Sequence, residues 1–256
     1  MNLTFYKYQG TGNDFVMIDN RSKTFKKGDS EIISHITNRH FGIGADGIIL
    51  IENDKELDFK MIYFNADGSQ TFCGNGARCA VAFAKKLNII KEETTFSAFD
   101  GTHFAEIENG IISLQMIDVA EMEINENSVF MYTGTQHHVE VVADLNQYPV
   151  FEHGKKIRDS YQDPGSNVNF VQQIDATTFR VRTYEKGVED ETLACGTGVT
   201  AVAIAMHKTN KTKSNLVSLE VEGGVLQVSF TEKKGTYESV FLKGPAEFVF
   251  KGNLNI

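Results

Sequence analysis

The sequence is poor in cysteine, and its few cysteines are not spaced as cross-links or metal ligands. Three occur in 256 residues, Cys73, Cys79 and Cys195, and no Cys-x-x-Cys pair is present. An odd and sparse set excludes the disulfide framework typical of small secreted domains, and zinc sites use closely spaced pairs. We therefore expect reduced thiols and no bound metal.

Long apolar runs are missing as well. No stretch approaches the roughly 18 apolar residues of a membrane-spanning helix. The first twenty residues include Lys7, Asp14 and Asp19, and they lack the apolar core of a secretion signal. These absences predict a cytoplasmic protein without a membrane partner.

Positive charge is scarce relative to negative charge. The chain has 25 lysines and arginines against 34 aspartates and glutamates, a net charge of -9 and a pI near 5.3. The phosphates of a nucleic acid and the headgroups of an anionic membrane repel such a protein. We expect neither as a partner, and a small molecule is the expected ligand.

Proline is scarce too, with three residues in the chain, and no low-complexity linker separates the two halves. If the chain has two domains, we therefore expect the boundary to be a tight crossover near 117–120. A boundary is indicated because one motif occurs twice. Cys73-Gly74-Asn75-Gly76 and Cys195-Gly196-Thr197-Gly198 lie 122 residues apart, close to half the chain length, and each leads into an apolar segment. A repeat of this length indicates two similar domains.

Strand-like and helix-like segments follow the same order in both halves. In the first half, strands at 3–8, 15–19, 47–52 and 59–65 and a helix at 30–40 precede the helix after Cys73, and a meander over 96–116 follows it. In the second half, strands at 131–132, 139–144, 167–172 and 179–185 precede the helix after Cys195, and strands at 216–221, 225–230 and 239–243 follow it. The segment 246–253 remains and suits a return to the first half. We therefore predict an α+β protein with domains at 1–117 plus 245–256 and at 118–244.

A cysteine directly before a helix is in a position that favours its thiolate. The first-turn N–H groups are unpaired and the helix dipole adds partial positive charge, which lowers the thiol pKa from about 8.5 toward neutrality. The following glycines let an anion such as a carboxylate reach these N–H groups. A carbon acid between two such thiols can lose a proton to one and gain a proton from the other, which inverts its configuration without a cofactor. The paired motif thus indicates a racemase or an epimerase.

Other interpretations of these segments are weaker. Cys79 lies inside the helix without a glycine loop of its own, and a small buried hydrophobe is its expected role. A thiol–disulfide redox protein would use the Cys-x-x-Cys motif that is absent. Gly42–Gly47 spells Gly-x-Gly-x-x-Gly, but this segment opens onto a strand, the reverse of a dinucleotide-binding turn.

Five motifs, in order along essentially the whole chain, resemble those of the diaminopimelate epimerase family. They are Gly10-Thr11-Gly12-Asn13-Asp14-Phe15, Gly44-Ala45-Asp46-Gly47, Phe64-Asn65-Ala66-Asp67-Gly68-Ser69, Cys73-Gly74-Asn75-Gly76-Ala77-Arg78-Cys79 and Glu191-Thr192-Leu193-Ala194-Cys195-Gly196-Thr197-Gly198. The resemblance implies an epimerase that interconverts LL- and meso-diaminopimelate for lysine and peptidoglycan synthesis, with no pyridoxal phosphate or other cofactor. It also implies two pseudo-symmetric domains, each a mixed, barrel-like sheet around a central helix, and commonly a homodimer.

The resemblance further implies roles for individual residues. Cys73 and Cys195 are the implied proton donors and acceptors, and His137 and Glu185 support the thiols or the substrate amine. The implied substrate-binding residues are Asn13, Asn65, Gly74, Asn75, Asn167, Glu185, Lys186, Gly196 and Thr197. Asp14 and Asp67 are interpreted as turn residues outside the site.

The departures from the family pattern concern the distal end of the substrate. Lys186 replaces an arginine that binds the distal carboxylate, and an ammonium cannot form the bidentate contact of a guanidinium. Thr135 and Gln136 replace the Asn or Ser and the Pro before His137, and Gly47 stands where some members have a glutamine. The alternatives are therefore a related two-cysteine racemase of another amino acid, such as histidine, and a non-racemising isomerase or binding protein on the same fold.

Overall fold

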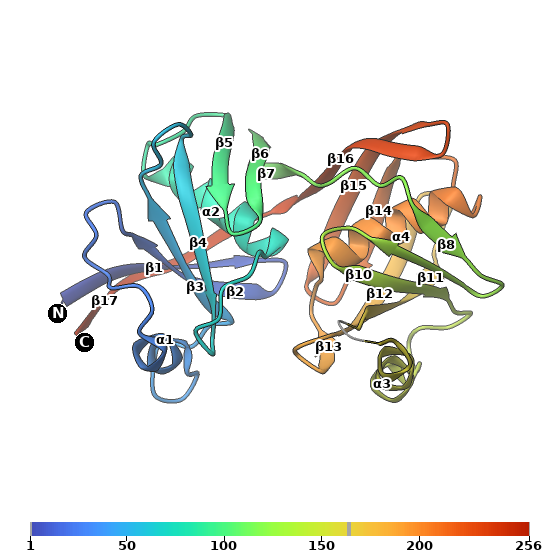
Figure 1. Ribbon diagram of the computed structural model, residues 1–256, viewed down its shortest axis with the longest axis horizontal. Coiled ribbons are helices and arrows are strands. Elements are labelled where there is room, and N and C mark those ends of the chain that lie inside the picture. Colours follow the sequence, from blue (N-terminus) through green and yellow to red (C-terminus); the bar gives the residue numbers. More distant parts are fainter. Residues whose placement is uncertain (1, 163–164, 256) are drawn as a thin grey trace. The chain divides into compact units, whose positions relative to one another are not determined.

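The computed structural model describes residues 2–162 and 165–255, which form two compact units (Figure 1). The first unit comprises Met1–Leu114 and Gly244–Ile256, and the second comprises Gln115–Lys243. The chain therefore leaves the first unit once and returns to it with its last strand. No helix of the described residues is long and apolar enough to cross a membrane.

The first unit is a mixed sheet that surrounds one helix. Its strands are β1 (Asn2–Gly10), β2 (Asn13–Asp19), β3 (Gly47–Glu52), β4 (Phe59–Asn65), β5 (Glu93–Ala98), β6 (Gly101–Glu108), β7 (Ile111–Gln115) and β17 (Glu247–Asn255). They pair in the order β17-β1-β2-β3-β4-β5-β6-β7, with parallel pairs at β2–β3 and β4–β5 and antiparallel pairs elsewhere. The central helix α2 (Gly74–Lys86) contacts β1 to β4, whereas α1 (Ser30–Thr37) packs on β3.

The second unit repeats this plan. Its strands are β8 (Met122–Ile124), β9 (Ser128–Tyr132), β10 (Gln136–Val141), β11 (Asn167–Gln173), β12 (Thr178–Glu185), β13 (Asp190–Thr192), β14 (Leu216–Val221), β15 (Gly224–Lys233) and β16 (Thr236–Pro245). Apart from β13, which pairs with β12, the order is β8-β9-β10-β11-β12-β14-β15-β16, with parallel pairs at β10–β11 and β12–β14. The central helix is α4 (Gly196–Lys208), and α3 (Val150–Ser160) packs on β11 and β12.

The central helices are buried because they are built from small and apolar residues. Ala77, Ala80 and Ala84 on α2 and Ala201, Ala203 and Ala205 on α4 are fully buried. Short side chains let the surrounding sheet approach the helix closely. The apolar surface buried between helix and sheet stabilises the folded unit by about 25 cal/mol per Å². The two pseudo-symmetric, barrel-like units predicted from the sequence are thus confirmed (Figure 1).

The strand registers make the two units comparable residue by residue. Gly47 pairs with Phe15 and Ile49 pairs with Tyr63 in the first unit. Asn167 pairs with His137 and Asn169 pairs with Thr183 in the second. A Cβ at Gly76 in the first turn of α2 would meet Ile49 and Phe15, and one at Gly198 in the first turn of α4 would meet Asn169. We call Phe15, Ile49 and Tyr63 the first floor, and the residues equivalent to them in register, His137, Asn169 and Thr183, the second floor.

Local signals explain where the smaller elements differ from expectation. The helix expected over 30–40 ends at Thr37, because Asn38 is extended and its side-chain oxygen accepts from the backbone N–H groups of His40 and Phe41. Asp29 begins the helix by accepting from Ile32 N at 3.1 Å. The three-residue strands β8 and β13 were not expected, because such short segments carry too little alternation to be recognised.

Candidate active site

Cys73 is the N-cap residue of α2. Its backbone is extended, with φ -132° and ψ 116°, and its Sγ accepts from Gly76 N at 3.4 Å. This places the sulfur at the positive end of the helix dipole, with first-turn N–H groups beside it. Cys73 therefore occupies the N-cap position that the sequence predicts for it.

The Asn13 side chain links the β1–β2 turn to the start of α2. Its Oδ1 accepts from Asn75 Nδ2, and its Nδ2 donates to Asp46 Oδ2 at 3.1 Å. Because a carboxylate can only accept, Asp46 fixes which end of the Asn13 amide faces Asn75. Asn75 itself is 1% exposed, so this contact orders the second residue of α2.

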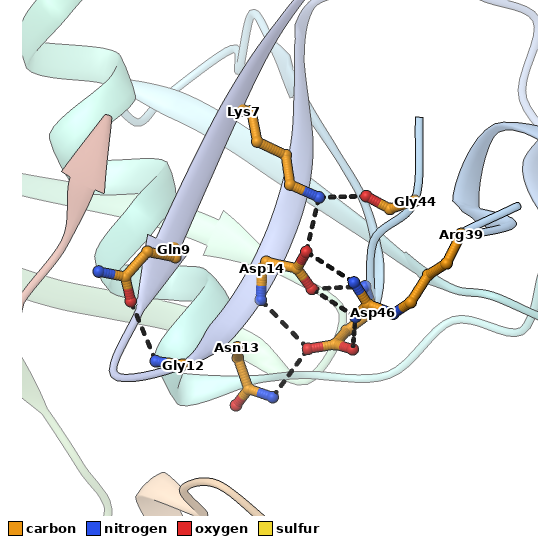
Figure 2. Close-up of polar contacts among 8 residues, drawn as sticks. All are labelled: Lys7, Gln9, Gly12, Asn13, Asp14, Arg39, Gly44 and Asp46. Atoms are coloured by element: carbon orange, nitrogen blue, oxygen red, sulfur yellow. Dashed lines mark hydrogen bonds and ion pairs between the residues drawn. The ribbon is translucent and has the colours of Figure 1, made fainter. Parts of the chain in front are cut away.

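Asp46 and Asp14 are held by a network of cations (Figure 2). Arg39 donates to both carboxylates, at 2.7 Å to Asp14 Oδ1 and 2.7 Å to Asp46 Oδ1, and Lys7 lies 2.7 Å from Asp14 Oδ2. Burial alone would raise the pKa of Asp14, but hydrogen bonds from Arg39 and Lys7 outweigh it and lower the pKa to about 2. Asp14 is therefore ionised at neutral pH and belongs to a charged cluster rather than to a simple turn.

Asn65 and Asp67 order the loop before Cys73. Asn65 Nδ2 donates to Ser69 Oγ at 3.0 Å and to Thr71 Oγ1 at 3.2 Å, while Asp67 Oδ1 accepts from Ser69 N at 2.8 Å. The interpretation of Asp67 as a turn residue agrees with this contact. Gly47 pairs with Asn65, and a Cβ at Gly47 would lie 2.4 Å from Phe64 O, so the strand geometry here requires glycine.

Cys195 is the N-cap residue of α4, and its surroundings differ from those of Cys73. Its Sγ lies 3.5 Å from Thr197 Oγ1, and Asn167 Nδ2 points to it at 3.8 Å. The thiol is 5% exposed. Two polar side chains, Thr197 and Asn167, thus lie next to this sulfur, in addition to the partial positive charge of the helix end.

His137 lies wholly buried in the second floor. Its Nε2 is 2.9 Å from Thr197 Oγ1, and its Nδ1 is 3.1 Å from Asn169 Nδ2. Burial, with a smaller contribution from the positive charge of Lys186, lowers the pKa of His137 to about 3. The imidazole is therefore neutral at physiological pH.

Glu185 and Lys186 lie at the end of β12, next to these residues. Thr192 Oγ1 donates to Glu185 Oε2 at 3.0 Å, and the Lys186 backbone N–H donates to Asn167 Oδ1 at 2.9 Å. Asn167 therefore connects the Lys186 backbone with the Cys195 sulfur. The second unit brings together Cys195, Thr197, His137, Asn167 and Lys186, as a single cluster.

Several residues that shape these clusters were not singled out from the sequence. They are Asp46, Arg39 and Lys7 in the first unit and Asn169, Thr183 and Thr133 in the second. The Thr133 Oγ1 donates to Thr197 O at 2.9 Å. One signal was available for Asn169. It lies two residues after Asn167 on the same face of the strand, and polar residues on a buried face require partners.

Arg78 and Cys79 are buried in α2 and differ in character. Arg78 is 0% exposed, its Nη2 donates to Thr11 Oγ1 at 2.8 Å, and none of the described residues accepts from its Nη1. Burial lowers the pKa of Arg78 to about 10, which still leaves it charged at neutral pH. Burial raises the pKa of the Cys79 thiol far above its ordinary value, so Cys79 is a protonated core residue.

Comparison with known proteins adds a family to this geometry. The family model described as diaminopimelate epimerase matches residues 5–116 and 129–249. A diaminopimelate epimerase of Flavobacterium psychrophilum is 58% identical over 253 residues, covering 97% of this chain and 99% of that protein. A diaminopimelate epimerase of Aquifex aeolicus is 39% identical over 276 residues, covering 99% of this chain and 98% of that protein.

Solved structures support the fold at much lower sequence identity. A phenazine biosynthesis protein of the PhzF family from Bacillus anthracis aligns with a TM-score of 0.79 at 14% identity over all of both chains. A hydroxyproline epimerase from Agrobacterium vitis, with bound trans-4-hydroxy-L-proline, aligns with a TM-score of 0.71 at 13% identity, covering 99% of this chain and 92% of that one. The structural likeness shows the two-unit fold, and the sequence matches show that the chain belongs to the diaminopimelate epimerase family of isomerases.

Proposed function

We propose that this protein interconverts LL- and meso-diaminopimelate by two-base proton transfer at the α-carbon. The observation that supports this most strongly is that Cys73 and Cys195 each occupy the N-cap position of a buried central helix. The family membership supplies the substrate class. The product would serve lysine and peptidoglycan biosynthesis.

In the proposed reaction, one cysteine reacts as a thiolate and the other as a thiol. The thiolate removes the α-proton from one face of the substrate, and the thiol delivers a proton to the opposite face. The two sulfurs exchange protonation states, and the configuration at carbon is inverted. Atoms and charge balance without a cofactor.

The remaining residues would bind the substrate or support the thiols. First-turn N–H groups at Gly74, Asn75, Gly196 and Thr197 would hold the carboxylate at the reacting centre. His137 and Glu185 would support the thiols or the substrate amine. The residues proposed for the distal end of the substrate are Asn13, Asn65, Asn167 and Lys186.

The test is incubation of the purified protein with LL-diaminopimelate and a panel of L-amino acids in deuterated water. We expect diaminopimelate to be epimerised with deuterium at the α-carbon, as measured by chiral chromatography and mass spectrometry. Cys73→Ala and Cys195→Ala should each abolish epimerisation, whereas Cys79→Ala, which removes a buried thiol outside the site, should retain it. Full turnover by either of the first two variants would contradict the two-base proposal.

A two-cysteine racemase of another amino acid is the second candidate, and Lys186 favours it. An ammonium at this position binds a distal carboxylate less specifically than a guanidinium does. Activity on another amino acid without activity on diaminopimelate would establish this alternative. A non-racemising isomerase or binding protein would instead incorporate no deuterium.

We also propose that the protein acts in the cytoplasm and forms a homodimer. A reducing compartment would keep Cys73 and Cys195 as thiols, the form that the proposed proton transfer requires. Strand β17 pairs through one edge with β1 and exposes Phe248, Val249 and Phe250, a surface that a second copy could cover. Analytical ultracentrifugation of the natural protein and of Val249→Lys should give a dimer and a monomer, respectively.

A further inference from the structure

Asn169 is a wholly buried amide in the second floor, beneath the first turn of α4. Its Nδ2 donates to His138 O at 2.9 Å and lies 3.1 Å from His137 Nδ1, and its Oδ1 accepts from Thr183 Oγ1 at 2.9 Å. The fit to the helix is close, because a Cβ at Gly198 would lie 2.5 Å from Asn169 Oδ1. The second glycine of the Cys-Gly-x-Gly motif thus gives this amide its space.

The partners of Asn169 determine its orientation. A backbone carbonyl can only accept, so the amide nitrogen must face His138 O, and the hydroxyl of Thr183 then donates to the amide oxygen. The second hydrogen of Nδ2 points to His137 Nδ1, which must be the unprotonated nitrogen. Because the buried imidazole is neutral, its single proton is on Nε2.

The protonated Nε2 determines the role of the Thr197 hydroxyl. Nε2–H donates to Thr197 Oγ1 at 2.9 Å, so the hydroxyl hydrogen is directed elsewhere, and Cys195 Sγ lies 3.5 Å away. We infer that Asn169 is a positioning residue that, through His137, fixes the Thr197 hydroxyl as a donor to Cys195 Sγ and so favours the thiolate of Cys195. The inference rests on the proposed role of Cys195 as an acid and base.

The tautomer of His137 can be observed directly. Imidazole ¹⁵N spectra of the natural protein, assigned by the signal lost in His137→Gln, should show His137 unprotonated at Nδ1 and protonated at Nε2. In Asn169→Asp a carboxylate replaces the donor, so the proton should move to Nδ1. A protonated Nδ1 in the natural protein would overturn the inference.

The consequence for Cys195 is measured in the same proteins. In Asn169→Asp, kcat should fall about tenfold to a hundredfold, the value of one hydrogen bond to a charged group. The rate of Cys195 alkylation, followed peptide by peptide by mass spectrometry, should shift to higher pH. The matched control is Gln173→Glu, an exposed amide-to-acid change on the same strand, which should change neither.

Two further results separate the possible failures. Thr197→Val removes the proposed donor, so an unchanged pH profile of Cys195 alkylation in this variant would overturn the inference. If Cys195→Ala retained full epimerisation, the proposed function would fail, whereas the His137 tautomer in the natural protein would still report on Asn169 alone.

Discussion

The first floor and the second floor occupy equivalent positions under the two cysteine helices, yet their chemistry is opposite. In the first, Phe15 packs edge-on against Tyr63 with ring centroids 5.8 Å apart, and Ile49 fills the space below Gly76. In the second, His137, Asn169 and Thr183 form a chain of hydrogen bonds that reaches Thr197. The two units share one backbone plan, but the side chains of the two floors differ in polarity.

This difference shows that a cysteine at a helix N-cap can have two different sets of neighbours. Near Cys73 the support is a backbone N–H from Gly76 and the buried charge of Arg78. Near Cys195 the position equivalent to Arg78 is Thr200, whose hydroxyl bonds Gly196 O within its own helix at 2.9 Å. The neutral side chains of Thr197 and Asn167 instead lie next to the Cys195 sulfur. If the two thiols act on one carbon, the unequal surroundings give each a separate means of setting its thiol pKa.

The largest expected effect comes from adding a methyl group at the second glycine of each motif. In Gly198→Ala the new Cβ would lie 2.5 Å from Asn169 Oδ1, the acceptor from Thr183 in an amide whose Nδ2 also contacts His138 O and His137 Nδ1. Displacing this amide should cost about 3 kcal/mol of the free energy of unfolding, since each stranded buried group costs about 1–3 kcal/mol. Gly76→Ala meets Ile49 Cδ1 at 3.0 Å, and that flexible end can move. Equal losses in urea denaturation would show that the floors do not differ in rigidity.

The shared motif could be predicted from sequence, and the floors could not. Cys73 and Cys195 were found because a thiol, two glycines and a helix are contiguous in the chain. His137 was suggested by a family resemblance, but its partner Asn169 lies 32 residues further along, and Thr183, which bonds Asn169, lies 46 residues further along. They meet only because β10, β11 and β12 pair in one particular register. Periodicity reports which residues are buried, and it does not report which buried polar groups will be partners.

The next effect is the acid sensitivity of the second unit. His137 has a lower pKa in the folded protein, about 3, than in the unfolded chain, about 6.5, so the unfolded state binds more protons between these values. The free energy of unfolding should therefore fall with decreasing pH, by about 1.4 kcal/mol per pH unit, starting near the unfolded pKa. Denaturation at pH 6 and pH 4.5 should show this slope in the natural protein and a smaller one in His137→Gln. If His137→Gln retained the full slope, the pH dependence would come from other groups. The control is His40→Gln, which changes an exposed histidine and should keep the slope of the natural protein.

A smaller effect is expected in the first unit from Arg78→Met. The guanidinium is buried without a carboxylate partner among the described residues, and its positive charge attracts the Cys73 thiolate. Removing it should move the pH profile of Cys73 alkylation to higher pH and lower kcat a few-fold near neutrality. The free energy of unfolding should be unchanged or raised, because replacing a buried charge with an apolar side chain of similar size is often stabilising. Lys85→Met, an exposed loss of the same charge on the same helix, should leave the profile in place.

The last prediction tests the polarity of the second floor by removing one hydroxyl. Thr183→Val keeps the shape of the side chain but removes the donor to Asn169 Oδ1, so a buried acceptor loses its partner at a cost of about 1–3 kcal/mol. Thr200→Val is the matched control in the same unit, because its hydroxyl bonds only a carbonyl that the helix already pairs, and its loss should cost less than about 0.5 kcal/mol. If the two variants unfold at the same urea concentration, the hydrogen bond from Thr183 does not stabilise Asn169. The second floor would then differ from the first in composition, but it would not hold the start of the Cys195 helix more rigidly.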